Sequence, residues 1–429
     1  MGIKSKVSRR ALMKGGLAAA GLPVVSKLMG SPAVTEAKAK ATDLSFAAVP
    51  GQKGGQDITG AYEVDPNWPK PLSGLPGNEQ WTWGSGESVF AENPDRVFIL
   101  QRGSLPNIKK PKTIDLPQLG PSITFPIGRL PWRDATAASP PGELDGPNRG
   151  TENVDWKWQN CIVTVNAQGD ITETFPQWDS MLRRPHSVYI SPYDKDKYVW
   201  LVDDYRHAIF KFTHDMKKLV QTIGTPNVHG SDATHFYRPT YMSWLPDGTF
   251  FIADGYVNTR VAKFDKDGKF ILDWGQKGTP PNETRPGYFN GVHGLAIDVP
   301  SGRVFVSDRN NHRIQVFDTN GKFLYLWKIG DQPSDLHLIH LSAADRHIWA
   351  FDRGTNKMIK YDLEGNFMYS WGTFGDFPGG FWGVHGMHVD QDGNVYTAEV
   401  DNGRAQKFVP KKGANPAMLI GPGVKPVWS

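Results

Sequence analysis

Asp254-Gly-Tyr-Val-Asn-Thr-Arg-Val-Ala-Lys-Phe264 and Asp308-Arg-Asn-Asn-His-Arg-Ile-Gln-Val-Phe317 are two copies of one pattern, and this repeat decides the fold. Each copy continues into an Asp-Gly or Asn-Gly turn and a closing apolar run that contains a tryptophan. Weaker copies begin at Asp203, Asp352 and Glu399, so the five starts lie 44 to 54 residues apart. Repeats of about this length are typical of the blades of a β-propeller.

The copies carry the pattern of short antiparallel strands. Apolar and polar residues alternate, as around Ile314 and Val316, and Asp-Gly or Asn-Gly dipeptides separate the runs. This pattern predicts hairpins in a meander, and no 3.6-residue apolar period follows residue 80, so we expect an all-β chain. An earlier segment with residues 96–100 and 161–165 can supply a sixth blade. We expect six blades, with a seventh only if residues 45–80 contribute strands.

A Pro-rich insertion at about residues 103–155 interrupts the first blade. A loop of this length without a clear pattern is commonly a lid, a binding loop or a surface segment. The nearly 390 residues that follow the N-terminal region suffice for one propeller, so we expect a single domain over residues 42–429. The one cysteine, Cys161, excludes an internal disulfide and lies in a strand pattern, where it is expected as a small buried apolar residue.

The N-terminus has the features of a twin-arginine export signal. Ser8-Arg-Arg-Ala-Leu-Met-Lys14 precedes a mildly apolar Gly/Ala/Leu stretch and then small residues up to Ala41. We therefore expect residues 1–41 to be a signal peptide, recognised by the twin-arginine translocation machinery and removed near Thr42. The predicted location is periplasmic or secreted.

The formal charge of +4 comes from this N-terminal region. Residues 1–41 hold eight Lys/Arg and one acidic residue, and the remainder holds 40 Lys/Arg against 43 Asp/Glu, a net charge of −3. A domain with this net charge lacks the excess of positive charge that binding to nucleic acid requires. Because no run approaches about 20 apolar residues, no membrane anchor is expected either.

Three histidines stand in nearly the same local phrase: Pro185-His186-Ser-Val188, Val292-His293-Gly-Leu295 and Val384-His385-Gly-Met387. Counted along the chain, they fall on blades two, four and six, and each opens the innermost strand that lines the central channel. Three neutral imidazoles spaced around one axis can hold Zn²⁺ and leave a fourth position open. The structural alternative is that each lines a water-filled tunnel. The equivalent residue on blade five is His337, with His340 nearby, and whether either faces the channel stays open.

These residues and repeats resemble the peptidyl-α-hydroxyglycine α-amidating lyases, six-bladed propellers of the NHL-repeat group that hold a catalytic zinc ion with three histidines. The similarity runs from about Arg96 to Phe408 and is strongest in the two copies quoted first. The resemblance implies that His186, His293 and His385 bind zinc.

The resemblance also implies catalytic residues. The active-site tyrosine of the family falls on Tyr256, and its two arginines fall on Arg102 in Leu100-Gln-Arg-Gly103 and on Arg309 in Ser307-Asp-Arg309. On structural grounds alone, Tyr256 could simply pack in a turn, and the Asp-Arg pair at Arg309 recurs at Arg353 as a repeat feature. Family members carry an aspartate that helps to hold calcium immediately after the third histidine, where this chain has Gly386. A calcium ion is therefore doubtful.

The chemistry of the family asks for these residue types. Cleaving the C–N bond of a carbinolamide requires a Lewis acid near the hydroxyl oxygen and a base for its proton. A tyrosine can serve as the base if its pKa is lowered, and arginine suits the capture of a substrate carboxylate. We therefore expect an exported zinc-dependent lyase acting on a small or peptide-derived, carbinolamide-like substrate. A metal-dependent hydrolase of the lactonase kind and a non-catalytic NHL binding platform are the alternatives.

Overall fold

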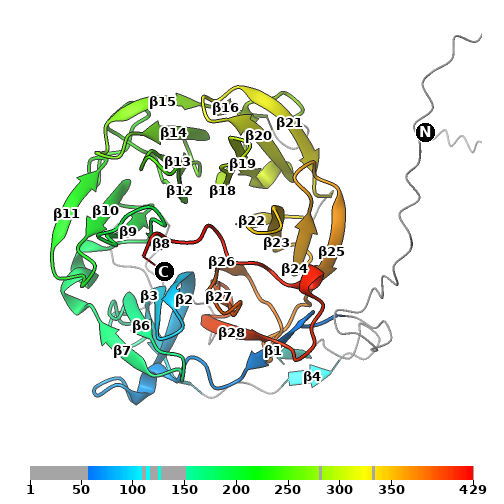
Figure 1. Cartoon of the computed structure of the whole chain (residues 1–429). Helices are drawn as coiled ribbons and strands as arrows, with labels where there is room; N and C mark the ends of the chain where they lie inside the picture. Colours follow the sequence, from blue (N-terminus) through cyan, green and yellow to red (C-terminus); the bar gives the residue numbers. More distant parts are fainter. Residues whose placement is uncertain are drawn as a thin grey trace, which may run out of the picture. The chain divides into compact units, whose positions relative to one another are not determined.

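The computed structural model describes residues 57–108, 113–115, 124–126, 151–279, 283–330 and 334–428. Six four-stranded antiparallel sheets follow one another around a central channel as the blades of a β-propeller (Figure 1). The predictions of an all-β chain and of six blades are thus confirmed. The expected signal peptide, residues 1–41, lies outside the described residues, and its prediction stays a prediction.

In each blade the first strand lies at the channel and the last at the rim. The first three blades are β2(Trp81–Asn93)-β3(Arg96–Pro106)-β6(Ile162–Val165)-β7(Ile171–Thr174), β8(Pro185–Ile190)-β9(Val199–Asp203)-β10(Ala208–Phe212)-β11(Leu219–Ile223) and β12(Met242–Trp244)-β13(Phe250–Asp254)-β14(Arg260–Phe264)-β15(Phe270–Trp274). The last three are β18(Val292–Asp298)-β19(Arg303–Asp308)-β20(Arg313–Asp318)-β21(Phe323–Lys328), β22(Leu336–Ser342)-β23(His347–Asp352)-β24(Lys357–Tyr361)-β25(Phe367–Trp371) and β26(Val384–Val389)-β27(Val395–Glu399)-β28(Arg404–Pro410)-β1(Tyr62–Asp65).

The sixth blade joins the two ends of the propeller. Its outermost strand is β1, which pairs antiparallel with β28 from Tyr62 opposite Pro410 to Asp65 opposite Lys407. Within the described residues 57–80, β1 completes blade six, and no seventh blade forms there. The last residues of the chain run across the centre of the ring (Figure 1), where the Val427 amide donates a hydrogen bond to the Pro192 carbonyl at 2.8 Å.

The first blade contains the insertion. Its strands β3 and β6 pair from Val97 opposite Val165 to Leu100 opposite Ile162, as the sequence predicts, although about 55 residues separate them in the chain. Within the insertion, β4(Thr113–Asp115) pairs with β5(Thr124–Pro126). The short pair β16(Gln276–Lys277)-β17(Tyr288–Phe289) lies between blades three and four.

The only helices among the described residues are short 3₁₀ turns: η1(Leu72–Gly74), η5(Pro176–Met181), η6(Arg309–Asn311) and η7(Pro416–Met418). In this part of the chain no helix has the length and apolar character needed to cross a membrane. Cys161 is buried and carries no disulfide, in agreement with its expected place in the core.

The acidic residue that begins each sequence repeat ends the second strand of its blade and fixes the loop that enters the first strand. The Asp308 carboxylate accepts the Asn290 amide at 2.8 Å, two residues before β18, and also pairs with Arg313 at 2.7 Å. Asp203 accepts the amides of Arg183 and Arg184 in the same way, at 2.7 and 3.0 Å. The repeat is therefore visible in the sequence because it holds the start of each channel-lining strand in place.

Candidate metal centre

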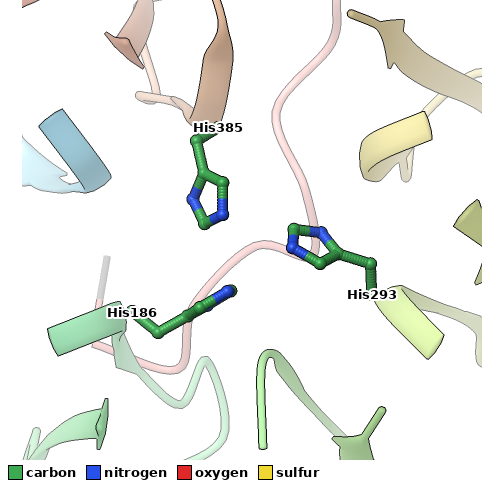
Figure 2. A group of neighbouring side chains, drawn as sticks. All are labelled: His186, His293 and His385. Atoms are coloured by element: carbon green, nitrogen blue, oxygen red, sulfur yellow. The ribbon is translucent and has the colours of Figure 1, made fainter. Parts of the chain in front are cut away.

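The side chains of His186, His293 and His385 meet on the axis of the ring (Figure 2). All three are buried, and one ligand nitrogen from each lies within 4.8 Å of the others. They come from β8, β18 and β26, the channel strands of blades two, four and six. The sequence predicted this convergence. Among the described residues, this is the one group of three or more histidine, cysteine or acidic side chains whose ligand atoms all lie within 4.8 Å of one another.

A break in strand pairing turns each histidine toward the axis. The register between the first and second strands shifts between Pro185 and Ser187 and again between Val384 and Gly386, so His186 and His385 each lie in a bulge. On blade four the shift spans His293. Bulges bend a strand and re-aim a side chain, and they are common beside active sites.

Backbone carbonyls orient two of the imidazole rings. The Nδ1 atom of His385 hydrogen-bonds to the carbonyl of Glu87 at 2.8 Å, and that of His293 to the carbonyl of His337. A carbonyl only accepts, so Nδ1 carries the proton in both rings and the lone pair is left on Nε2. This tautomer is the one that a metal ion at the axis requires.

The electrostatic surroundings keep the three rings neutral. Burial lowers the pKa of His186, His293 and His385 well below the usual 6.5, and neighbouring histidines and arginines lower it further. Because the neutral imidazole is the form that coordinates metals, the donor set fits a zinc ion near neutral pH.

Tyr256 places its hydroxyl between two of the histidines. The phenol oxygen lies 3.1 Å from His186 Nε2 and 2.9 Å from His293 Nε2. Its loop follows β13 and presses against the start of β18, where a Cβ on Gly255 would meet the Val292 carbonyl oxygen at 1.7 Å. Only glycine fits there, so the Gly-Tyr pair of the repeat sets the position of the hydroxyl.

Arg309 lies on the same side of the centre. Its guanidinium carbon is 6.0 Å from the centre of the Tyr256 ring, and its Nε donates to Asp335 at 2.7 Å. Burial raises the pKa of Tyr256 above 10, while the positive charge of Arg309 opposes that shift. The Asp-Arg pair of blade four thus reaches the site, whereas Arg353 of blade five pairs with Asp401 at 2.6 Å.

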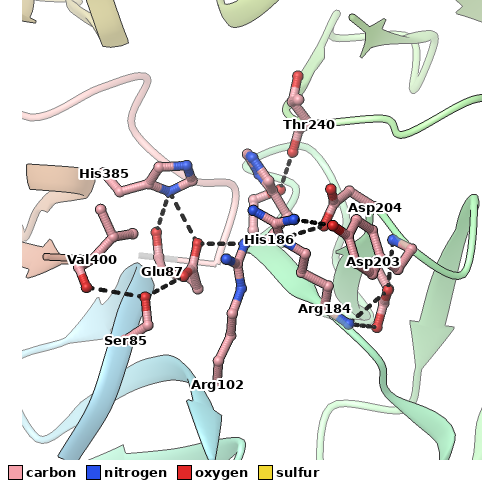
Figure 3. Close-up of polar contacts among 12 residues, drawn as sticks. Ser85, Glu87, Arg102, Arg184, His186, Asp203, Asp204, Thr240, His385 and Val400 are labelled. Carbon is pink, nitrogen blue, oxygen red and sulfur yellow. Dashed lines mark hydrogen bonds and ion pairs between the residues drawn. The ribbon is translucent and has the colours of Figure 1, made fainter. Parts of the chain in front are cut away.

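Arg102 reaches the centre from the second strand of blade one and brings in a residue that the sequence did not single out, Glu87 (Figure 3). The Arg102 guanidinium is 3.0 Å from the Glu87 carboxylate, which also accepts the Ser85 hydroxyl at 2.6 Å. Burial raises the pKa of Glu87 and lowers that of Arg102, and the charge of each opposes the shift of the other.

His337 faces the channel, but His340 does not face the metal centre. The His337 ring lies 5.4 Å from the rings of both His293 and His385, and its Nε2 is 3.5 Å from Asp335. His340 hydrogen-bonds to the Gly421 carbonyl at 2.9 Å in the C-terminal stretch.

Tyr241 forms a floor beneath the histidines. Its ring centre is 5.1, 5.2 and 5.9 Å from those of His186, His293 and His385, and its hydroxyl donates to the His385 carbonyl. Tyr241 also lines a largely apolar cavity of about 180 Å³, together with Trp244 and other residues. The preceding Thr240, the sequence counterpart of the three histidines, donates its hydroxyl to backbone carbonyls and does not join the cluster.

Two further arginines flank the centre between blades two and three. Arg238 stacks on the Tyr256 ring at 4.7 Å and donates to Asp204 at 2.9 Å. Arg184 lies 3.6 Å from the same carboxylate, and Figure 3 shows this pair. No local sequence pattern signals this contact, because Asp204 and Arg238 are 34 residues apart and meet only when the blades pack.

The position after the third histidine has no room for a side chain. A Cβ on Gly386 would meet the Ser88 Cα at 2.6 Å and the Glu87 carbonyl oxygen at 2.9 Å. Blades six and one therefore touch through backbone at the place where the resembled family has its calcium-binding aspartate. The expectation that calcium is doubtful stays a prediction.

The comparisons with known proteins agree with the repeat. The NHL repeat matches residues 289–317, which include His293 and Arg309. The chain is 30% identical over 254 residues to peptidyl-alpha-hydroxyglycine alpha-amidating lyase 1 of Drosophila melanogaster, covering 55% of this chain and 46% of that protein. It is 37% identical over 142 residues to peptidyl-glycine alpha-amidating monooxygenase B of Xenopus laevis, covering 33% of this chain and 16% of that protein.

A third relative is a probable amidating lyase of Caenorhabditis elegans, 33% identical over 156 residues, which cover 36% of this chain and 42% of that protein. The chain thus spans less than half the length of each of these three relatives. The fold is that of a six-bladed β-propeller, and one segment of the chain matches the NHL repeat. Parts of the sequence are similar to proteins named as amidating lyases.

Proposed function

We propose that the protein is a zinc-dependent lyase that cleaves the C–N bond of a carbinolamide-like substrate. The observation that carries the proposal is the convergence of three neutral imidazoles with one phenol. Ligand nitrogens of His186, His293 and His385 lie within 4.8 Å of one another, and the Tyr256 oxygen is within 3.1 Å of two of them. Relatives named as amidating lyases at about 30% identity support the reaction class.

His186, His293 and His385 would hold the metal ion through Nε2. When bound, zinc supplies a Lewis acid that lowers the pKa of nearby oxygen atoms. The buried carbonyl contacts at Nδ1 keep two of the ligands in one tautomer, so binding requires no reorganisation of those rings.

Tyr256 would act as the base. Its phenolate oxygen takes the proton of the substrate hydroxyl, and the C–O bond becomes a carbonyl as the C–N bond breaks. The proton held by Tyr256 then passes to the nitrogen, which leaves as an amide. Burial disfavours the phenolate, and the charges of Arg309, Arg184 and Arg102 favour it. These three arginines therefore support the role of Tyr256 by opposing the effect of burial.

Arg102 and Arg309 would bind a carboxylate on the substrate. Arg102 is buried beside the histidines, and Arg309 reaches the tyrosine while Asp335 holds its Nε. Arginine presents several donors in one plane and suits a carboxylate. On an α-hydroxyglycine substrate, the fragment that carries this carboxylate would leave as glyoxylate.

We propose in addition that the protein is exported. The twin-arginine pattern in Ser8-Arg-Arg-Ala-Leu-Met-Lys14 supports passage through the twin-arginine translocation machinery to the periplasm or the exterior. Replacing Arg9 and Arg10 together by lysine should retain the full-length protein in the cytoplasm. N-terminal sequencing of the exported protein should give a start near Thr42.

The test of the reaction is glyoxylate release from N-benzoyl-α-hydroxyglycine by the zinc-loaded protein, residues 42–429. We expect turnover in the wild type and a kcat about 10²–10⁴-fold lower in a Tyr256→Phe protein that retains its zinc. A zinc-loaded wild type that releases no glyoxylate but opens lactone rings would overturn the lyase in favour of a hydrolase. A wild type that binds no zinc and has neither activity would overturn both enzymatic proposals and favour a non-catalytic binding platform.

A further inference from the structure

Glu87 occupies on blade one the position that the metal-binding histidines occupy on blades two, four and six. The pairing of β2 with β3 shifts register between Gly86 and Ser88, so Glu87 lies in the bulge. The corresponding shifts lie on either side of His186 and His385. The bulge therefore aims the Glu87 carboxylate toward the centre, although this carboxylate is not among the three groups that converge there.

Glu87 contacts both a candidate metal ligand and a candidate substrate-binding residue (Figure 3). Its backbone carbonyl accepts the Nδ1 proton of His385 at 2.8 Å, and its Oε2 lies 3.6 Å from the same nitrogen. The same Oε2 is 3.0 Å from Arg102. One residue thus connects His385 to Arg102 through two different groups.

The two charges depend on each other because both are buried. The Glu87 side chain is 0% exposed and that of Arg102 is 5% exposed. The Nε atom of Arg102 has no hydrogen-bond partner among the described residues. Among these residues, Glu87 is the one acidic residue that forms an ion pair with Arg102. A buried guanidinium without its carboxylate would carry an uncompensated charge, which destabilises a protein strongly.

We infer that Glu87 is a positioning residue that sets the orientation of Arg102 relative to the metal ligand His385. The inference rests on the proposed function, since it takes Arg102 as a group that contacts the substrate. Because the link to His385 uses the backbone of Glu87 and the link to Arg102 uses its side chain, a side-chain substitution separates the two.

The experiment compares Glu87→Gln and Glu87→Asp with the wild type, all as zinc-loaded protein of residues 42–429. Glutamine keeps the shape and the backbone carbonyl but removes the charge. We expect zinc content to stay at about one per chain, kcat for glyoxylate release to fall at least tenfold, and KM not to rise, because an unpaired Arg102 still attracts a carboxylate. The aspartate variant, which keeps the charge, should recover part of the lost kcat.

Two outcomes overturn the inference: wild-type kcat in the glutamine variant, or a loss of activity that only follows a loss of zinc. If Glu87→Gln does not fold, the double variant Glu87→Gln/Arg102→Met decides the matter. It should fold and bind zinc, as judged by thermal unfolding with and without the metal, since no unpaired charge is left. If it also fails to fold, Glu87 acts on the fold beyond Arg102. A wild type without zinc or turnover contradicts the proposed function instead.

Discussion

The even-numbered and odd-numbered blades present different residues where their first strands meet the channel. Blades two, four and six present His186, His293 and His385, whose ligand nitrogens converge. Blade five also presents a histidine, His337, in an equivalent bulge between Leu336 and Leu338. Its imidazole lies beside Asp335, and neither ring nitrogen has a hydrogen bond within the described residues.

The difference between His293 and His337 shows what makes a ligand in this ring. His293 has a carbonyl at Nδ1 that fixes its tautomer, and that carbonyl belongs to His337. His337 therefore contributes to the centre through its backbone, in the way that Glu87 contributes to His385. Blades one and five thus orient two of the three candidate ligands, which blades four and six supply.

The largest effect should separate these two histidines. Removing a group that only orients a ligand costs about 10–100-fold in metal affinity, so His293→Ala, which removes a ligand, should cost more than about 100-fold. His337→Ala keeps the carbonyl and should change the affinity by less than about tenfold. Competition with a chromophoric zinc chelator measures both. Equal losses in the two variants would contradict the division between blades.

The second comparison is between the two tyrosines that contact the histidines. Tyr256→Phe should lower kcat about 10²–10⁴-fold with zinc retained, because it removes the proposed base. Tyr241→Phe removes the hydrogen bond to the His385 carbonyl and should cost about 1 kcal/mol of folding free energy with kcat changed little. Steady-state kinetics with metal analysis tests both. A similar loss of kcat in the two variants would argue against a chemical role for Tyr256.

The third prediction concerns the glycine that brings Tyr256 to the even-numbered blades. Gly255→Ala places a Cβ at 1.7 Å from the Val292 carbonyl oxygen, and such overpacking should cost about 1–3 kcal/mol or more. Gly74→Ala is the matched control, since nothing lies within 4 Å of its Cβ position. Urea denaturation of the two variants gives the difference. Equal stability would mean that the loop can move away from β18.

The smallest effect concerns pH and the histidine of blade five. Burial, aided by the charge of Arg309, lowers the pKa of His337 to about 4 in the folded protein. As the pH falls from 6.5 toward 4, the unfolded chain takes up a proton that the folded protein does not, so folding stability falls. At pH 5 this residue accounts for up to about 2 kcal/mol of the decrease in the free energy of unfolding.

His337→Gln should therefore flatten the dependence of the unfolding free energy on pH between 7 and 5, measured on metal-free protein in the presence of a chelator. If the slope of the His337→Gln variant equals that of the wild type, His337 does not take part in the acid sensitivity.

The channel-lining histidines of the even-numbered blades could be predicted from the sequence because the same short motif recurs around each of them. The acidic residue that starts each repeat is recognisable for a physical reason: it holds the loop that leads into the channel strand, as Asp308 does for Asn290. The channel residue of blade one was not predicted, because the insertion between β3 and β6 hides the repeat there. Its signal was nevertheless present, since Glu87-Ser-Val89 parallels His186-Ser-Val188.

Contacts between blades could not be predicted from the sequence. The pairing of Arg238 with Asp204 and the link from Glu87 to His385 join residues 34 and 298 positions apart. Such pairs follow from how neighbouring blades pack, and no local periodicity encodes them. The histidine set could be predicted because it repeats, and the residues that orient it could not because each is different.

X-ray absorption at the zinc edge, on protein of residues 42–429 with its metal content measured, tests most directly whether the three histidines form a zinc site. We predict about one zinc per chain, coordinated by three imidazole nitrogens at about 2.0–2.1 Å and one oxygen ligand. The His186→Ala and His385→Ala proteins should lose this spectrum. A wild type that is fully folded, takes up no zinc when it is offered, and behaves like these variants would contradict the proposed metal centre.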